Sequence, residues 1–270
     1  MKSGTNWLGA LLNNHPAISC QGEYHWQEMI GPLYYRSGKS SMWGNPKFQH
    51  FVGARFEAAI KHSMVRAADP EATLIGDRTP HTIEPIVIRR APHISIIRDG
   101  RDICISRAFH LFNNPNVTKI FQRNRVAVKD LEAFQADAWI FNKEPFRLLR
   151  HEEIVRDTAR WWRQHLEADR QTVAKLPQLP VMFGKYEQLH TETVEIVRNV
   201  FLFLNVDPEQ APPLSRELLP GFEQERPDQF LRKGIVGDWK NYFDDNTKEW
   251  FKEEVGDELI TQGYESSHDW

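Results

Sequence analysis

The sequence predicts an α/β fold in which a mainly parallel sheet is flanked by helices. Short apolar runs have the length and composition of buried strands at residues 73–75, 94–97 and 180–183. Apolar residues recur at helical spacing over residues 102–112, 154–176 and 193–204. Because strands that alternate with helices are joined by crossover connections, we expect these strands to run parallel, with helices packed on the sheet.

Size and composition are those of an ordinary globular chain. The 270 residues contain 40% hydrophobic and 26% charged side chains, without repeats or Gly/Ser linkers, so we expect one domain over residues 1–270. The formal net charge of −3 argues against a broad basic surface for nucleic acid. No apolar run approaches the roughly 20 residues of a membrane helix. Two cysteines, Cys20 and Cys104, are too few for a four-cysteine zinc site or a disulfide framework, and we expect a cytoplasmic protein.

The first helix is expected to open at Gly4-Thr5. Its apolar side chains, at positions 7, 8, 11 and 12, recur at helical spacing, and His15-Pro16 ends the run. The residues ahead of it lack the charged and apolar regions of a secretory signal. They also provide no strand, so we expect the first strand of the sheet to be missing from this chain.

The opening segment Lys2-Ser3-Gly4-Thr5-Asn6 is the first candidate anion site. Free N–H groups at a helix N-terminus, a glycine that allows close approach of the backbone, and a lysine together bind phosphate or sulfate. A plain loop with a helix cap is the structural alternative. The lysine precedes the glycine, so the Walker A pattern is missing and a standard ATPase is not expected.

A second candidate lies where the apolar run at residues 94–97 ends in Arg98. Ligands of open α/β sheets bind at the carboxyl ends of the strands, so Arg98 stands where an anion would lie. A helix that begins at about Arg101 would bring the Ser106 hydroxyl toward the same anion. The structural alternative is an ion pair from Arg98 to Asp99 or Asp102.

A third candidate, Arg232-Lys233-Gly234, lies near the end of the chain. A guanidinium fork, an ammonium charge and a glycine N–H can together hold one phosphate, and a solvated basic turn is the alternative. Ahead of it, the proline- and charge-rich residues 212–228 are expected to form a loop or lid.

In their order and spacing these segments resemble the sulfotransferases that use 3′-phosphoadenosine 5′-phosphosulfate (PAPS). The opening resembles their K-S-G-T-T-W loop, and an arginine followed eight residues later by a serine resembles their 3′-phosphate segment. Residues 232–241 carry their closing R-K-G-x-x-G-D-W-K-N motif, and Tyr186-Glu187 is similar to their Y-E-D-L element. The resemblance extends from residue 2 to about residue 264.

The resemblance implies a P-loop-like three-layer fold that transfers the sulfuryl group of PAPS to a hydroxyl without a metal. The residues implied for the 5′-phosphosulfate are Lys2, Ser3, Gly4, Thr5 and Asn6. Lys2 would also stabilise the departing phosphate. The residues implied for the 3′-phosphate are Arg98, Ser106, Arg232, Lys233 and Gly234. Trp7 would stack on the adenine unless it belongs to the core, and Tyr186 would lie near that base.

The base that deprotonates the acceptor hydroxyl has three candidates. The segment from His15-Pro16 to Glu23 resembles H-P-x-x-x-C-x-x-E of the tyrosylprotein and Golgi-type members, whose glutamate is the base, so Glu23 is the first candidate. The cytosolic members use a histidine ahead of the arginine strand. His81 is therefore the second candidate, and His25 is the third.

Three positions depart from the family pattern. Met1 replaces a proline, Asn6 replaces a second threonine, and Asp244-Asp245-Asn246 stands where a dimer-forming element is expected, so the oligomeric state stays open. The missing first strand keeps a non-catalytic PAPS-binding remnant as an alternative. A nucleotide kinase-like phosphotransferase, which would need a metal-holding carboxylate at a strand end, is a further one.

The acceptor is expected to be a small molecule or a peptide that carries a hydroxyl. Aromatic residues are dense between residues 24 and 64, where they would line an apolar acceptor pocket or form plain core. Neither a nucleic acid nor a membrane is expected as a partner.

Overall fold

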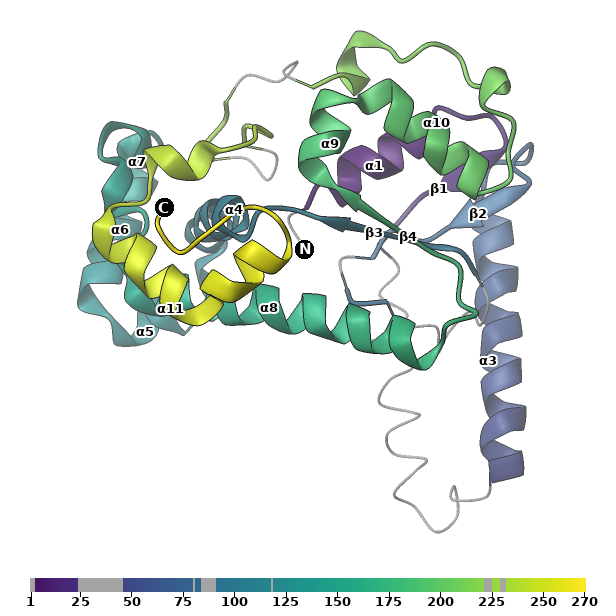
Figure 1. Cartoon of the computed structure of the whole chain (residues 1–270), viewed down its shortest axis with the longest axis horizontal. Helices are drawn as coiled ribbons and strands as arrows, with labels where there is room; N and C mark the ends of the chain where they lie inside the picture. The colour runs from purple at the N-terminus through teal and green to yellow at the C-terminus, as the bar shows by residue number, and fades with distance from the viewer. Residues whose placement is uncertain are drawn as a thin grey trace.

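The computed structural model describes residues 3–23, 46–79, 81–83, 91–117, 119–220, 225–228 and 232–270. The strands are β1 (Ile18–Cys20), β2 (Leu74–Gly76), β3 (His93–Ile97) and β4 (Val181–Lys185). The helices are α1 (Thr5–Leu12), α3 (Pro46–Ala67), α4 (Gly100–Asn113), α5 (Ile120–Arg123), α6 (Arg125–Ala136), α7 (Ile140–Lys143), α8 (Glu152–Lys175), α9 (Tyr186–Thr191), α10 (Thr193–Phe203) and α11 (Asp245–Thr261). Figure 1 shows their arrangement.

The described strands pair in parallel, as the alternation of strands and helices predicts. β1 pairs with β2 from Ile18↔Leu74 to Cys20↔Gly76. β3 pairs with β4 from His93↔Val181 to Ile97↔Lys185. Within the described ranges the two pairs form separate two-stranded sheets rather than the single sheet that was expected. The expectation of a missing first strand concerns the chain ahead of Ser3, which lies outside the described residues.

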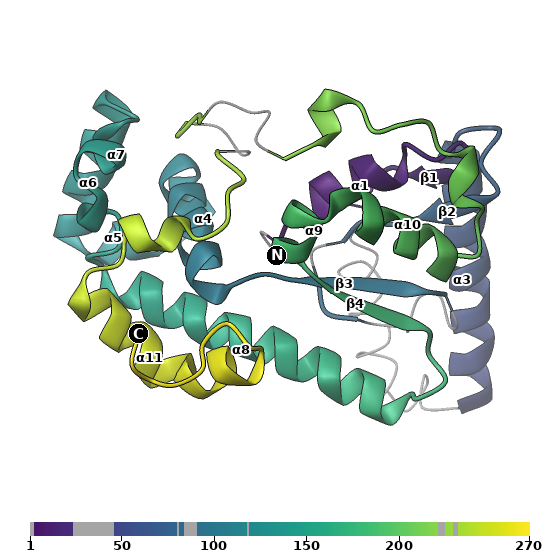
Figure 2. The same cartoon turned by 45° about the horizontal axis from the view of Figure 1, so that its top comes forward.

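Helices lie on both faces of the strands (Figures 1 and 2). α1, α9 and α10 lie on one face, and α8 runs along the other. The core on the first face consists of apolar residues from these helices and strands, among them Leu8, Leu11, Ile18, Leu189, Val197, Val200 and Phe201, with Ile94 and Ile96 packed against them. On the opposite face the Ser95 hydroxyl of β3 donates a hydrogen bond to Asp169 of α8 at 3.0 Å. Successive residues of β3 therefore contact opposite layers, as a strand between two helical layers requires.

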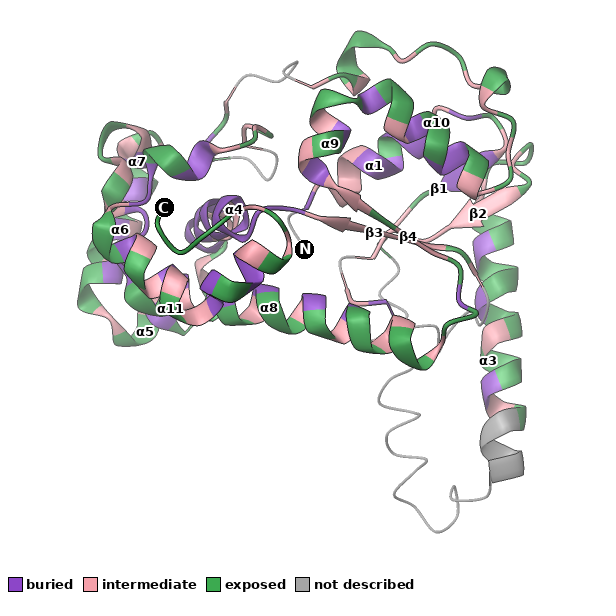
Figure 3. Cartoon of the chain, in the orientation of Figure 1, coloured by how far each residue is buried: buried purple, intermediate pink, exposed green. Residues whose placement is uncertain are grey.

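A second hydrophobic core lies around α4, α6, α8 and α11, where Figure 3 shows α4 to be buried along most of its length. Its fully buried members include Phe112, Phe141, Leu149, Val155 and Phe251. α4 begins three residues after β3 ends, at Gly100. This core therefore anchors the turn between β3 and α4, on which Arg98 lies.

None of the helices in the described residues is both long enough and apolar enough to cross a membrane.

Candidate functional site

Arg98 and Tyr186 lie side by side, because each is the first residue after one of the neighbouring strands β3 and β4. The register pairs Ile97 with Lys185, so the next residue of each strand emerges at the carboxyl edge of the pair. The guanidinium carbon of Arg98 lies 4.5 Å from the centre of the Tyr186 ring, and both residues are buried. Burial raises the pKa of the Tyr186 hydroxyl, which stays protonated and able to donate. The two strands thus place a cation and an aromatic ring at the edge where an anion was predicted.

The opening turn rests on the same aromatic ring. Gly4, the residue ahead of α1, has a φ of +83°, a left-handed conformation that glycine adopts without steric cost. A Cβ at this position would lie 2.6 Å from both Cδ2 and Cε2 of Tyr186. The Trp7 ring packs edge-on against Tyr186 at 5.8 Å, and its Nε1 donates to the Leu218 carbonyl at 2.8 Å. The backbone can lie this close to the ring because residue 4 has no side chain.

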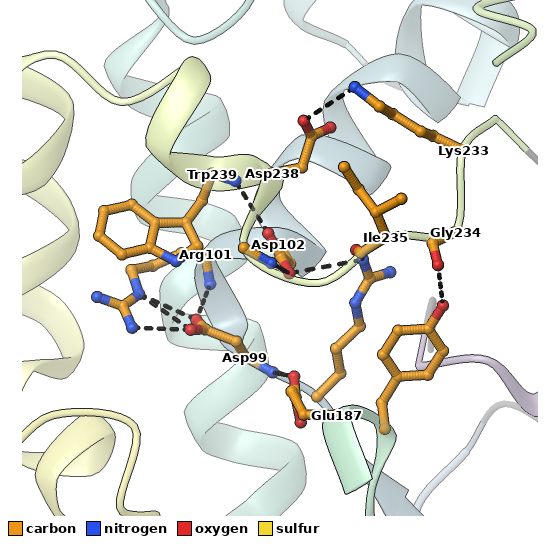
Figure 4. A network of polar contacts seen from close by, with 12 residues as sticks. Asp99, Arg101, Asp102, Glu187, Lys233, Gly234, Ile235, Asp238 and Trp239 are labelled. Atoms are coloured by element: carbon orange, nitrogen blue, oxygen red, sulfur yellow. Dashed lines mark hydrogen bonds and ion pairs between the residues drawn. The ribbon is translucent and has the colours of Figure 1, made fainter. Parts of the chain in front are cut away.

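The loop at residues 232–239 reaches the same place from the C-terminal part of the chain. The Tyr186 hydroxyl donates to the Gly234 carbonyl at 2.8 Å, and Nη2 of Arg98 donates to the Ile235 carbonyl at 2.8 Å. Figure 4 shows this loop passing over the turn between β3 and α4. The structure therefore brings together the three segments that sequence reasoning selected as anion sites.

Arg232 and Lys233 each contact two carboxylates. Arg232 forms ion pairs with Glu225 and Asp238, and Nζ of Lys233 lies 3.2 Å from Glu225 and 3.3 Å from Asp238. Burial alone would lower the pKa of Arg232, but the nearby carboxylates raise it above its usual value. The Arg232 guanidinium also lies 4.5 Å from the Phe109 ring centre. The alternative of a solvated basic turn is therefore wrong for Arg232, and a phosphate here would share the two cations with Glu225 and Asp238.

Asp99 caps α4 and pairs with Arg101. Its carboxylate accepts the backbone N–H of Arg101 at 2.9 Å and is also bonded by the guanidinium of that residue at 2.7 Å. The same guanidinium pairs with Glu265 and lies 3.9 Å from the ring centre of Trp239 and 4.6 Å from that of Trp270. An arginine that is buried, paired with two carboxylates and packed against two aromatic rings is structural.

The ion-pair alternative for Arg98 is confirmed for Asp102 and not for Asp99. Asp99 is not its partner, because that carboxylate faces Arg101, whereas Oδ2 of Asp102 lies 3.7 Å from Nη2 of Arg98. Burial raises the pKa of Asp102, while the charge of Arg98 and the backbone N–H donors act in the opposite direction. At 3.7 Å this is a long ion pair. Arg98 also donates a hydrogen bond to the Ile235 carbonyl and packs over the Tyr186 ring.

Glu187 and Trp162 support the turn after β3, and sequence reasoning assigned neither of them. The Glu187 carboxylate accepts the backbone N–H of Asp99 at 2.9 Å (Figure 4). It also accepts the Tyr264 hydroxyl at 3.1 Å. Nε1 of Trp162 donates to the Arg98 carbonyl at 3.1 Å. The Tyr186-Glu187 dipeptide was the only sequence signal for this support, since the partners lie far apart along the chain.

Two candidates for the base follow the carboxyl ends of paired strands. Glu23 is exposed and lies three residues after β1, and His81 is partly buried and follows β2. The pairing of β1 with β2, extended by a 3.0 Å hydrogen bond from the Arg78 N–H to the Gly22 carbonyl, places both segments at one edge.

Several predicted positions are not described. Lys2 and His25 lie outside the described residues, as do the aromatic residues Tyr24, Trp26, Tyr34, Tyr35 and Trp43 and the side chain of Phe48. Ser106 lies half-buried on α4, one turn beyond Asp102. Among the described side chains, no group of three His, Cys, Asp or Glu residues could hold a metal ion.

Comparison with known proteins gives one family and two similar structures. The family model described as sulfotransferase domain matches residues 1–262. No match is found among curated proteins. Mouse sulfotransferase SULT7A1 complexed with PAP is 18% identical, with 96% of this chain and 81% of that chain covered and a TM-score of 0.48. Retinol dehydratase in complex with androsterone and inactive cofactor PAP is 16% identical, with 96% and 78% covered and a TM-score of 0.46.

Proposed function

This chain belongs to the sulfotransferase family, and from that premise we propose how its residues carry out PAPS-dependent transfer of a sulfuryl group to a hydroxyl. The family match selects sulfuryl transfer over the phosphotransferase alternative. The observation that carries our assignment of the site is the convergence of Gly4, Arg98 and the 232–239 loop on the Tyr186 ring. Three separate segments with residue types suited to an anion therefore lie at one place, which supports a shared anionic ligand.

The first clamp is the opening turn, which we assign to the 5′-phosphosulfate. Ser3, Gly4 and Thr5 lie at the start of α1, where N–H groups and the helix dipole favour an anion. The side-chain oxygen of Asn6 is buried without a hydrogen-bond partner in the described part of the chain. Turning this amide over exchanges its oxygen for its NH₂ group, which can donate to an added phosphate oxygen, so the residue fits an anionic group in that orientation. Lys2 adds the positive charge.

The second clamp is assigned to the 3′-phosphate. It comprises Arg98 at the end of β3, Ser106 on α4, and the segment Arg232-Lys233-Gly234. The hydrogen bonds from Tyr186 to Gly234 and from Arg98 to Ile235 hold its two halves against each other. The Trp7 ring, which stands edge-on to Tyr186, is the proposed wall of the adenine site between the clamps.

The proposed chemical step is an in-line displacement at sulfur. The acceptor oxygen forms the new S–O bond as its proton passes to the carboxylate of Glu23. The bond from sulfur to the bridging phosphate oxygen breaks, and that oxygen keeps the electron pair. Lys2 and the positive end of α1 stabilise the charge that develops on it. We further propose that the chain acts as one domain in the cytoplasm, on small-molecule or peptide hydroxyls.

Calorimetry with two nucleotides tests the pair of clamps. Adenosine 3′,5′-bisphosphate should bind much more tightly than 5′-AMP, because 5′-AMP leaves the second clamp empty. Arg98→Ala should weaken bisphosphate binding by about tenfold to a hundredfold, the usual loss of a charge-assisted hydrogen bond. Equal affinities of the wild-type chain for the two nucleotides would refute the assignment.

Turnover measurements on three variants test the base. Glu23→Gln should lower sulfuryl transfer by about a hundredfold to ten-thousandfold while bisphosphate affinity stays nearly unchanged. His81→Ala and His25→Ala are the matched comparisons. If Glu23→Gln keeps its turnover and His81→Ala loses it, the role passes to His81. A panel of phenols, alcohols, sugars and tyrosine peptides serves as acceptors, and bisphosphate binding without turnover of any of them would favour the non-catalytic remnant.

A further inference from the structure

The loop at residues 232–239 is held through its backbone by one buried carboxylate. Asp102 lies in the first turn of α4, and its side chain has no exposed surface. Its Oδ2 accepts the N–H of Gly237 at 2.8 Å, and its Oδ1 accepts the N–H of Trp239 at 2.9 Å (Figure 4). Each carboxylate oxygen therefore accepts one N–H of the same loop. The N-terminal end of α4 favours the negative charge at this position.

The loop depends on such contacts because its own local structure is irregular. Gly234 and Gly237 have φ values of +63° and +79°, so the chain turns at both positions. The segment 232–237 belongs to no helix or strand. Because glycine has few steric restrictions, this segment could adopt many other conformations in the absence of fixed contacts. Fixed N–H and carbonyl partners are what restrict it to the conformation observed.

Asp102 also contacts the other half of the proposed second clamp. Its Oδ2 lies 3.7 Å from Nη2 of Arg98, and the same Nη2 donates to the Ile235 carbonyl at 2.8 Å. Asp102, Arg98 and the loop therefore form a closed ring of contacts. A change in the carboxylate would alter both the position of the loop and the orientation of the guanidinium.

We propose that Asp102 is a positioning residue that fixes the distance between Arg98 and Arg232-Lys233-Gly234, and thereby sets the selectivity of the enzyme for a nucleotide with a 3′-phosphate. The inference rests on the proposed function, in which these residues hold that phosphate. A clamp that is already ordered loses less conformational freedom when its ligand binds. Without Asp102 the loop would become ordered only when the nucleotide binds, and the loss of conformational freedom would weaken the affinity for that nucleotide.

The test compares Asp102→Asn with a matched control, Asp130→Asn. The asparagine keeps the size of Asp102 but places an NH₂ group where one loop N–H needs an acceptor. Asp130, on α6, is equally buried and accepts hydrogen bonds from Arg150 and His151. Asp102→Asn should weaken adenosine 3′,5′-bisphosphate binding about tenfold to a hundredfold and leave 5′-AMP binding within about twofold. It should raise KM for PAPS more than it lowers kcat, whereas Asp130→Asn should lower the melting temperature without changing the ratio of the two affinities.

An unchanged ratio of bisphosphate to 5′-AMP affinity in Asp102→Asn would overturn this inference alone and make Asp102 a structural residue. Equal affinities in the wild-type chain would overturn the proposed function, and this inference with it. If Asp102→Asn does not fold, amide hydrogen exchange on the wild-type chain decides. Slow exchange at Gly237 and Trp239 without nucleotide supports the inference, and protection that appears only with the bisphosphate overturns it.

Discussion

Replacing Gly4 with alanine tests whether the opening turn requires glycine. The alanine Cβ would lie 2.6 Å from two carbons of the Tyr186 ring, where carbon atoms normally approach to about 3.5–4.0 Å. The ring is not free to move away, because it is buried, its hydroxyl is bonded to Gly234 at 2.8 Å, and Arg98 covers it at 4.5 Å. Either the turn or the ring must shift by about 1 Å.

The expected loss of stability has two parts. An L-residue in the left-handed conformation costs roughly 1–2 kcal/mol, and overpacking against a fixed neighbour costs about 1–3 kcal/mol. The free energy of unfolding should therefore fall by about 2–5 kcal/mol, a large share of the stability of an ordinary domain. Gly263→Ala is the matched control. Gly263 has a φ of +69°, and the nearest atom to its Cβ position is Nζ of Lys185 at 3.6 Å, an ordinary contact, so this variant should show the backbone cost alone.

Urea denaturation of the wild-type chain and both variants measures the difference. Gly4→Ala should lose at least about 1 kcal/mol more than Gly263→Ala, because only the first alanine meets the ring. Gly4→Ala should also bind adenosine 3′,5′-bisphosphate more weakly, since a displaced Tyr186 no longer supports Gly234. Equal losses of stability in the two variants would show that the Gly4 turn does not rest on Tyr186.

Three further groups away from Gly4 allow direct measurements. In the proposed site, Glu225 would compete with the 3′-phosphate for the cations at residues 232–233, so Glu225→Gln should strengthen bisphosphate binding by about threefold to tenfold in calorimetry; weaker binding would contradict the competition. Burial raises the pKa of Cys20 to about 11 and that of Cys104 to about 12. A thiol reagent at about pH 8 should therefore label both cysteines in the denatured chain and neither in the native chain, and rapid labelling of the native chain would contradict this. Burial also lowers the pKa of His151 below its usual value of about 6.5, so the unfolded chain takes up this proton first as the pH falls. The free energy of unfolding should therefore be highest above that pH and decline below it, with a shallower decline in His151→Gln; identical slopes would exclude this contribution.

Local pattern determined most of the secondary structure around the site. The strands β3 and β4 and the helices α4, α8 and α10 lie within about two residues of the ranges predicted, because apolar periodicity and helix caps are properties of neighbouring residues. The strand β1 was not predicted, because a serine interrupts its three residues, Ile18-Ser19-Cys20, and leaves no apolar run. The helix α11 was also missed, and its helical pattern is interrupted at Val255, whose φ of −145° departs from a helix.

The chemistry of the site was equally readable from the sequence, but the pairing of its charges was not. The opening segment, Arg98 and Arg232-Lys233-Gly234 are residue types suited to an anion wherever they lie. Whether Asp99 or Asp102 meets Arg98 depends on how the chain turns after β3. The turn directs Asp99 to Arg101 and leaves Asp102 facing the loop.

What the sequence determined by itself is therefore most of the helices and strands around the site and the residue types suited to an anion, because both depend on neighbours along the chain. Only the tertiary structure decided that Asp102 accepts a hydrogen bond from the N–H of Gly237, 135 residues away. The same holds for Glu187, which accepts the N–H of Asp99, 88 residues away. Such contacts form when the packing of two cores brings distant backbone segments together. A hydrogen bond of this kind is set by the position of the backbone. Every residue type except proline can contribute an N–H, so no local pattern of side chains encodes the contact.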